Sequence, residues 1–259
     1  MRKAIVATCM SVLLISVVLP ARAITFGQLD AGQHPQAGAL VAEFGDPPAL
    51  GPFCSGTLIS PTVFLTAAHC IQAIEAFGLD PWWVTLSSPA DSTATLLTGT
   101  AHVAPGANAG GFNDPLDLGV VVLNAPVTGV TPAQLPSAGL LDQLSLKGAT
   151  FTPVGYGTTR DTQQGGFQSI MDNSDRWFAT QFFLSLQKAW LLLSMNPATG
   201  SGGTCYGDSG GPHFLGGPTS NLIVSITVTG DAVCKATDKT YRLDTPAARA
   251  FLDDFVALP

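Results

Sequence analysis

From residue 203 the chain reads Gly203-Thr204-Cys205-Tyr206-Gly207-Asp208-Ser209-Gly210-Gly211-Pro212, a serine framed by an aspartate and several glycines. A serine hydroxyl is a weak nucleophile unless a neighbouring base takes its proton. The glycines leave the backbone free to aim the N–H groups of Gly207 and Ser209 at one point. There they can stabilise the negative oxygen of a tetrahedral intermediate. The stretch therefore predicts a nucleophilic serine with an oxyanion hole.

Two earlier segments carry the side chains that such a serine needs. The first reads Leu65-Thr66-Ala67-Ala68-His69-Cys70, and the second reads Asp117-Leu118-Gly119-Val120-Val121-Val122-Leu123. Histidine has an ordinary pKa of about 6.5, so it can take a proton and return it near neutral pH. A buried carboxylate fixes the tautomer of the imidazole and stabilises the imidazolium. The order His69, Asp117, Ser209 therefore predicts a catalytic triad.

One rival class of hydrolase has to be weighed, because the residues around Ser209 also fit the G-x-S-x-G pattern of the α/β-hydrolases. That fold needs a serine, then an acid, then a histidine along the chain. The histidine that follows Ser209 is His213, which lies too close in sequence to serve as that partner. We also expect His34, His102 and His213 to be surface or loop histidines.

The N-terminus has the features of an export signal. Arg2 and Lys3 precede an apolar stretch over residues 4–19, and Ala21-Arg22-Ala23 fits a signal peptidase site. The stretch is shorter than the ~20 residues that a membrane-spanning helix needs. We predict a signal peptide over 1–23, a secreted, extracellular protein over 24–259, and no membrane association after cleavage.

Composition narrows the classes of partner. The formal net charge is −7, and only 11% of the residues are charged. Since no cluster of Lys and Arg occurs, nucleic acid is not expected as a partner. We expect a peptide or protein substrate, with a protein inhibitor as a possible further partner. No metal and no cofactor are expected, because close Cys or His pairs with metal-ligand spacing do not occur.

Many short apolar runs separated by turn residues indicate an all-β protein, either a barrel or a sandwich. These runs are residues 40–44, 56–59, 63–65, 82–86, 118–123, 152–154 and 222–228. A C-terminal helix is predicted over about 246–257, because Asp244 or Thr245 can cap it and Pro246 fits its first turn. A second helix is a weaker prediction over 176–193. The turn-rich stretch 134–148 is the best candidate for a linker between two halves.

Four cysteines remain after signal cleavage: Cys54, Cys70, Cys205 and Cys234. In an exported chain they indicate two disulfides, and three pairings are possible.

These segments resemble the chymotrypsin family of trypsin-like serine peptidases, and Val154-Gly155-Tyr156-Gly157-Thr158 is similar to that family's G-W-G element with Tyr for Trp. The resemblance covers nearly the whole predicted mature chain. It implies two six-stranded antiparallel β-barrels, over about 24–135 and 145–245, with the active site between them. It also implies the disulfides Cys54–Cys70 and Cys205–Cys234.

The resemblance further implies a role for each site residue. His69 is the general base, Asp117 its partner and Ser209 the nucleophile, with Gly207 and Ser209 as oxyanion donors. Ser225 matches the serine that hydrogen-bonds the triad aspartate. In the family, a freed Ile amine inserts beside the Asp that precedes the nucleophile. Because the predicted signal cleavage falls before Ile24, we expect export itself to expose an amine that pairs with Asp208.

The substrate pocket is expected to involve Gly203, Thr204, Tyr206, Ile226 and Thr227. In the family the floor of the pocket lies six residues before the nucleophile, and Gly203 places no carboxylate there. Selectivity for Lys or Arg is therefore not expected, although Asp231 and Asp238 remain carboxylates that could enter the site. Ile226 replaces the usual Trp and Thr227 the usual Gly. The alternative to a peptidase is a secreted non-catalytic binding protein on the same scaffold.

Overall fold

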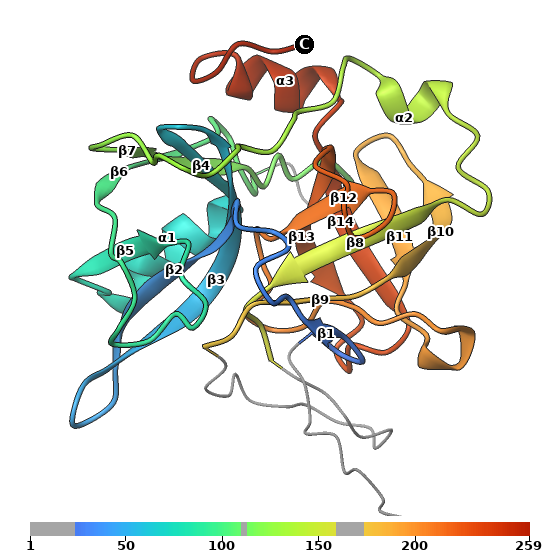
Figure 1. Ribbon diagram of the computed structural model, residues 1–259. Coiled ribbons are helices and arrows are strands. Elements are labelled where there is room, and N and C mark those ends of the chain that lie inside the picture. The colour runs from blue at the N-terminus through green and yellow to red at the C-terminus, as the bar shows by residue number, and fades with distance from the viewer. Residues whose placement is uncertain (1–23, 110–112, 159–173) are drawn as a thin grey trace, which may run out of the picture.

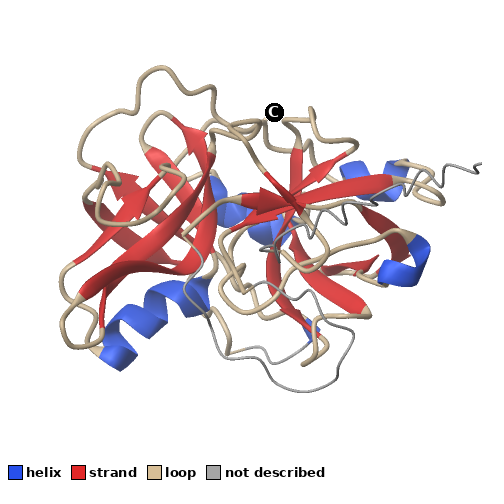
Figure 2. Ribbon diagram, turned by 60° about the horizontal axis from the view of Figure 1, so that its bottom comes forward, coloured by secondary structure: helices blue, strands red, loops and turns tan. Residues whose placement is uncertain are grey.

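The computed structural model describes residues 24–109, 113–158 and 174–259, so the predicted signal peptide lies outside the described part. Two β-sheet units lie side by side, one built from the N-terminal half of the chain and one mainly from the C-terminal half (Figure 1). Strands make up most of the secondary structure, and the few helices lie at its periphery (Figure 2).

The N-terminal unit is a six-stranded antiparallel sheet with the order β5-β2-β3-β4-β7-β6. Its strands are β2 (Ala37–Phe44), β3 (Ala49–Ser60), β4 (Val63–Thr66), β5 (Trp82–Thr85), β6 (Gly99–Val103) and β7 (Gly119–Leu123). The sheet curls into a half-barrel. Among the described residues no ladder joins its two edge strands, β5 and β6.

The C-terminal unit contains a closed barrel. Eight strands follow the order β1-β9-β8-β10-β11-β14-β13-β12, and a further pairing of β8 with β12 closes six of them into a ring. The strands are β1 (Gln28–Leu29), β8 (Thr150–Gly155), β9 (Trp177–Phe178), β10 (Gln181–Leu186), β11 (Trp190–Ser194), β12 (Pro212–Leu215), β13 (Ile223–Gly230) and β14 (Thr237–Arg242). Although β1 comes from the start of the described chain, it pairs with β9 and therefore belongs to this unit (Figure 1).

The predicted fold class is confirmed: the protein is mostly β, with a curled six-stranded sheet, a closed six-stranded barrel and a C-terminal helix. The helix α3 (Pro246–Leu252) is shorter than the predicted 246–257. It starts as expected, since the Thr245 hydroxyl accepts the Ala248 N–H at 3.2 Å. It ends before Asp253 and Asp254, because negative charges at the C-terminal end of a helix oppose its dipole.

The helix predicted over 176–193 is wrong. Those residues form β9, β10 and β11, and the last two strands pair as an antiparallel hairpin. Aromatic and leucine side chains pack well on a pleated sheet, and this tertiary packing outweighs their helical pattern. Three further elements are α1 (Ala68–Phe77), α2 (Leu140–Gln143) and the 3₁₀ turn η2 (Pro197–Thr199), and α2 lies within the predicted linker.

The interior holds more polar groups than the sequence predicts. His34 and His213 are both buried, with exposed fractions of 1% and 0%. His34 lies in a loop, as expected, whereas His213 lies in the strand β12, so the prediction was wrong for it. His34 bonds the buried Asp30, and His213 Nε2 lies 2.9 Å from Oδ2 of the buried Asp238. Each histidine thus has a carboxylate partner that lies far from the catalytic motifs in sequence.

In the described part of the chain no helix has the length and apolar character to span a membrane.

Candidate active site

His69 lies in the first turn of α1, directly after the strand β4 and the two buried residues Ala67 and Ala68. The first N–H groups of a helix have no partner within the helix, and they attract negative charge. The Asp117 carboxylate meets this demand, because its Oδ1 accepts the backbone N–H of His69 at 2.8 Å. Helix start and carboxylate therefore hold each other in place.

The same carboxylate binds the imidazole ring. Asp117 Oδ2 lies 2.6 Å from His69 Nδ1, and Asp117 is 2% exposed. Burial alone would raise the pKa of Asp117, but the hydrogen bonds and the charge interaction with His69 lower it below its ordinary value. Asp117 is thus a buried, ionised partner, while the His69 side chain remains 37% exposed. The free Nε2 of the ring is the atom left to face a substrate or a nucleophile.

Ser209 belongs to a loop of the C-terminal unit that crosses to the N-terminal unit. Its carbonyl oxygen accepts the Ser55 N–H from β3 at 2.8 Å and lies 3.6 Å from the sulfur of Cys70, the residue after His69. The structure therefore brings the backbone of Ser209 beside the start of α1, across 139 residues of sequence. Within the described residues, no hydrogen bond joins the Ser209 hydroxyl to His69.

The residues before Ser209 have the geometry of an oxyanion hole. Gly207 has a φ of +96°, which favours glycine, and Thr158 donates its N–H to the Tyr206 carbonyl at 2.6 Å. Because the N–H and C=O of one peptide point in opposite directions, the Gly207 N–H points away from Thr158. In the described part of the chain neither the Gly207 N–H nor the Ser209 N–H has a hydrogen-bond partner. Both donors are available to a ligand.

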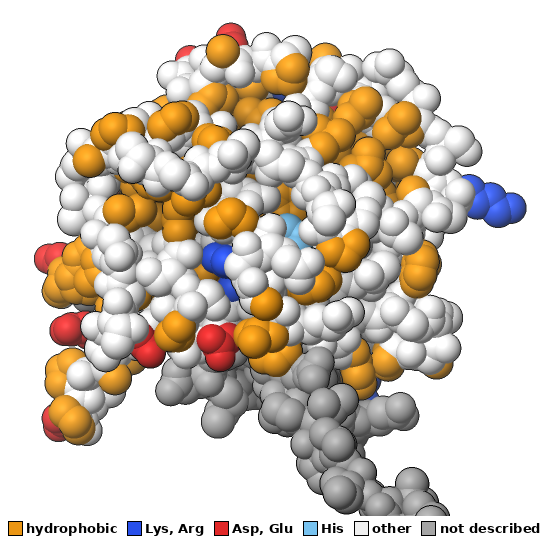
Figure 3. All heavy atoms as spheres, in the orientation of Figure 1, with side chains coloured by type: hydrophobic (Ala, Val, Ile, Leu, Met, Phe, Trp, Pro, Cys, Tyr) orange, Lys and Arg blue, Asp and Glu red, His pale blue; other side chains and the backbone are white. Residues whose placement is uncertain are grey.

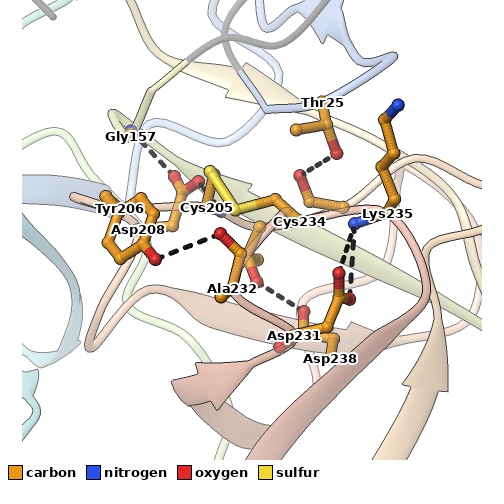
Figure 4. Close-up of a disulfide and its surroundings, with 12 residues drawn as sticks. Thr25, Gly157, Cys205, Tyr206, Asp208, Asp231, Ala232, Cys234, Lys235 and Asp238 are labelled. Atoms are coloured by element: carbon orange, nitrogen blue, oxygen red, sulfur yellow. Dashed lines mark hydrogen bonds between the residues drawn. A yellow bond between two sulfur atoms is a disulfide. The ribbon is translucent and has the colours of Figure 1, made fainter. Parts of the chain in front are cut away.

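Asp208, between Gly207 and Ser209 in this loop, has a fully buried side chain. Its two oxygens accept the N–H groups of Gly157 and Cys205, each at 2.8 Å (Figure 4). Burial raises the pKa of Asp208 to about 7, the two N–H groups oppose the rise, and the charge of Asp238 adds to it. Within the part of the chain that the structure describes, the carboxyl group has no positive partner of the kind that an ionised buried carboxylate needs.

Ile24 lies buried with Trp177 and Ala179, at the start of the described chain. The next residue, Thr25, exchanges two backbone hydrogen bonds with Gly203, at 2.8 and 2.9 Å. Gly203 lies two residues before Cys205, which bonds Asp208. The segment that starts at Ile24 is therefore held along the loop of residues 203–211, which we call the nucleophile loop. No contact between Ile24 and Asp208 occurs among the described residues, so their pairing stays a prediction.

Both implied disulfides form, Cys54–Cys70 and Cys205–Cys234. The first joins β3 to α1 beside His69, and the second joins the nucleophile loop to the segment before β14 (Figure 4). Each bridge therefore restrains one side of the site.

A cavity of about 300 Å³ opens at Ser209. It is lined by Thr204, Cys205, Tyr206, Ser209, Thr227, Val228, Thr229, Gly230, Asp231, Ala232 and Cys234. Thr204, Tyr206 and Thr227 were expected in it, and the Tyr206 hydroxyl donates to the Ala232 carbonyl at 3.1 Å at its rim (Figure 4).

Two expected pocket residues do not line this cavity. Gly203 pairs with Thr25, and the space where a side chain would begin is filled by Met195 at 2.2 Å. Ile226 is fully buried in the core between β12 and β14. Of the two uncertain carboxylates, Asp231 lines the cavity, whereas Asp238 is buried and accepts the Thr204 hydroxyl at 2.7 Å.

The expected bond from Ser225 to Asp117 does not form. The Ser225 hydroxyl accepts a hydrogen bond from Thr240 on the neighbouring strand at 2.8 Å, and this contact turns it away from the triad. Asn108 takes its place, with its side-chain N–H donating to Asp117 Oδ1 at 3.3 Å. Asn108 has a φ of +63°, a conformation that asparagine tolerates better than most residues. Sequence reasoning missed it because its loop carries no motif.

The comparisons with known proteins agree with this geometry. A family model described as Trypsin matches residues 29–251. The chain belongs to the trypsin family. It is 30% identical over 206 residues to "Brachyurin" from Leptuca pugilator, which covers 74% of this chain and 85% of that relative. It is 28% identical over 198 residues to "Chymotrypsin" from Phaedon cochleariae, covering 73% of this chain and 67% of the relative.

Family membership makes this trypsin-family protein a serine endopeptidase, a hydrolase that acts on peptides or proteins. The comparisons do not favour the alternative of a non-catalytic binding protein. The disulfides are consistent with an oxidising, extracellular setting.

The raised pKa of Asp208 predicts how stability depends on pH while the peptide bond before Ile24 is intact. Below the ordinary value of 3.8 Asp208 is protonated in both the folded and unfolded states, and above about 7 the folded state must bury a charge. The free energy of unfolding should therefore fall as pH rises from about 4 through about 7, by on the order of 4 kcal/mol from this group. Urea unfolding of the Ser209→Ala chain at several pH values measures it.

Asp208→Asn in the same background is the control. The amide cannot accept both N–H groups, so this variant should be less stable, but its curve should be flatter between pH 4 and pH 7. Parallel curves for the two chains would contradict a raised pKa at Asp208.

Because Asn108 rather than Ser225 bonds Asp117, we expect the variants Asn108→Ala and Ser225→Ala to differ in activity. Asn108→Ala removes a donor to the ionised Asp117, so kcat/KM should fall by roughly threefold to tenfold. Ser225→Ala removes a hydroxyl that faces Thr240 and should change kcat/KM less. Steady-state kinetics on one peptide substrate would compare them, and a larger loss in Ser225→Ala would contradict the assignment.

Proposed function

We propose that the chain is a secreted serine endopeptidase that cleaves peptide bonds through His69, Asp117 and Ser209. The observation that carries the proposal is the double contact of Asp117 with His69, at 2.6 and 2.8 Å, beside the loop of Ser209. A buried carboxylate in this position holds the imidazole in the tautomer whose Nε2 can accept a proton. His213 also has a carboxylate partner, Asp238, but it is fully buried, whereas the His69 side chain is 37% exposed.

The reaction follows from these positions. His69 Nε2 takes the proton of the Ser209 hydroxyl while Ser209 Oγ attacks the peptide carbonyl carbon. The carbonyl oxygen becomes negative and is stabilised by the N–H groups of Gly207 and Ser209. The imidazolium then gives its proton to the leaving amine, and an acyl-enzyme remains. Water, deprotonated by His69, attacks the ester in the same way and releases the second product.

Specificity follows from the cavity beside Ser209. Thr204, Thr227 and Asp231 all line it. The Asp231 carboxylate accepts the backbone N–H groups of Lys235, Ala236 and Thr237. Since that carboxylate is already bound by its own loop, it offers little to a cation. We therefore expect no selectivity for Lys or Arg. As a separate expectation, a protein inhibitor would bind the same cavity.

The remaining partner expectations rest on the surface and the termini. Charged side chains are sparse on the face in Figure 3, and the acidic ones lie mainly along the lower left, with others at the top of the molecule. Because the sequence has 11 Lys and Arg against 18 Asp and Glu, nucleic acid is not expected to bind. Cleavage after Ala23 would remove the apolar N-terminal stretch and leave no membrane attachment.

A fluorophosphonate probe tests the function directly. It forms a covalent bond with an activated serine, so the native protein should be labelled at Ser209, as located by peptide mass spectrometry. Ser209→Ala should abolish labelling, and His69→Ala should reduce it by at least 10²-fold because the base is lost. A correctly folded, correctly processed protein that is not labelled would sink the proposal.

Activation is the second part of the proposal: signal cleavage frees the Ile24 amine, which pairs with Asp208. Two observations support this step: Ile24 is buried, and the buried carboxyl group of Asp208 has no cationic partner among the described residues. N-terminal sequencing of the active enzyme should therefore begin at Ile24. An active enzyme that begins several residues later, or one with a residue still attached before Ile24, would show that this amine is not required.

A further inference from the structure

Ser55 occupies a position where the two units meet. It lies on β3 of the N-terminal unit, pairs with Ala39 of β2, and is fully buried. All of its polar groups have partners. Its own carbonyl accepts the Thr66 hydroxyl at 2.8 Å, within the N-terminal unit, and its other contacts cross to the C-terminal unit.

Those other contacts reach both residues of the proposed oxyanion hole. The Ser55 N–H donates to the Ser209 carbonyl at 2.8 Å, and the Ser55 hydroxyl donates to the Gly207 carbonyl at 3.0 Å. One residue therefore fixes the carbonyl groups of the two residues whose N–H groups are free. A carbonyl belongs to the planar peptide group that joins its residue to the next one. Fixing the Gly207 carbonyl therefore fixes the peptide on the C-terminal side of Gly207.

The hydroxyl has a second contact that sets its direction. Its oxygen accepts the Tyr156 N–H at 3.0 Å, so its single proton is left for Gly207. Two residues later, Thr158 donates to the Tyr206 carbonyl. Both peptide groups that flank Gly207 are thus anchored from outside the loop, one by Thr158 and one by Ser55. This matters because Gly207, with its positive φ, has little conformational preference of its own.

We infer that the Ser55 hydroxyl is a positioning group for catalysis, which holds Gly207 in the orientation that stabilises the oxyanion. The inference rests on the proposed function, since it assigns Gly207 and Ser209 the role of oxyanion donors. Ser55 touches neither substrate nor the reacting atoms. Its effect passes through the Gly207 peptide, and it couples the N-terminal unit, which holds the base, to the loop that holds the nucleophile.

The test compares Ser55→Ala with Thr57→Val. The first variant keeps the Ser55 N–H and removes only the hydroxyl. The second removes another buried hydroxyl of the same strand, one that has no hydrogen-bond partner among the described residues. Kinetics are normalised by fluorophosphonate titration of active sites, so that unfolded molecules do not count.

Ser55→Ala should lower kcat by roughly 10- to 100-fold, below the 10²- to 10³-fold loss for a whole oxyanion donor, with KM within about twofold. A peptide boronic acid, which forms a negatively charged tetrahedral adduct with Ser209, should lose affinity by a similar factor. Thr57→Val should leave both quantities within about twofold. This split between kcat and KM, with matching loss of boronate affinity, is not expected of a purely structural role.

Three outcomes would overturn the inference: an unchanged kcat, a rise in KM alone, or an unchanged boronate affinity in Ser55→Ala. Ser55→Gly, which also keeps the N–H, repeats the test if Ser55→Ala does not accumulate. Failure of both to fold would overturn it too, since Ser55 would then serve stability instead. If the native enzyme hydrolyses the peptide and Ser55→Ala has the same kcat, only this inference is wrong. If the native enzyme is inactive, the proposed function is wrong.

Discussion

The buried carboxyl group of Asp208 is the constraint around which the site is arranged. A carboxylate away from water needs donors on both oxygens, and the loop supplies the N–H groups of Gly157 and Cys205. Such close approach leaves no room for side chains at Gly155 and Gly157, where a Cβ would lie 2.1 and 2.4 Å from the Asp208 carboxyl group. The same arrangement sets the path of the chain into Ser209, so the orientation of the nucleophile follows from the needs of its neighbour.

The two β-sheet units contribute different parts of the chemistry, and neither is sufficient alone. The N-terminal unit supplies His69 on α1 and Asp117 before β7, and these two hold each other through the helix start and the imidazole. The C-terminal unit supplies Ser209 and the free N–H groups. In the proposed mechanism the contacts between the units therefore belong to the active site, and a shift of about 1 Å between them would separate the proposed base from the proposed nucleophile.

The departures from the family pattern concern the residues that support the triad. Tyr156 stands for the usual Trp, and its hydroxyl donates to the Ser87 carbonyl at 2.7 Å and accepts from Arg176 at 3.1 Å. Arg176 in turn pairs with the buried Asp30 at 2.9 Å. A polar network thus occupies a place where an indole would rely mainly on packing. Likewise, Asn108 approaches Asp117 while Ser225 bonds Thr240.

By itself the sequence determined the fold class and the predicted strands, and it predicted the residues of the site, because short apolar runs, a capped helix and three motifs are local signals. The structure places His69 against Asp117 and forms both predicted disulfides. Only the tertiary structure decided that residues 176–193 are strands, that His34 and His213 are buried, that Asn108 bonds Asp117, and that Ser55 bonds Gly207. Each of these depends on partners distant in the chain, and packing and hydrogen bonding between distant segments leave no local pattern in sequence.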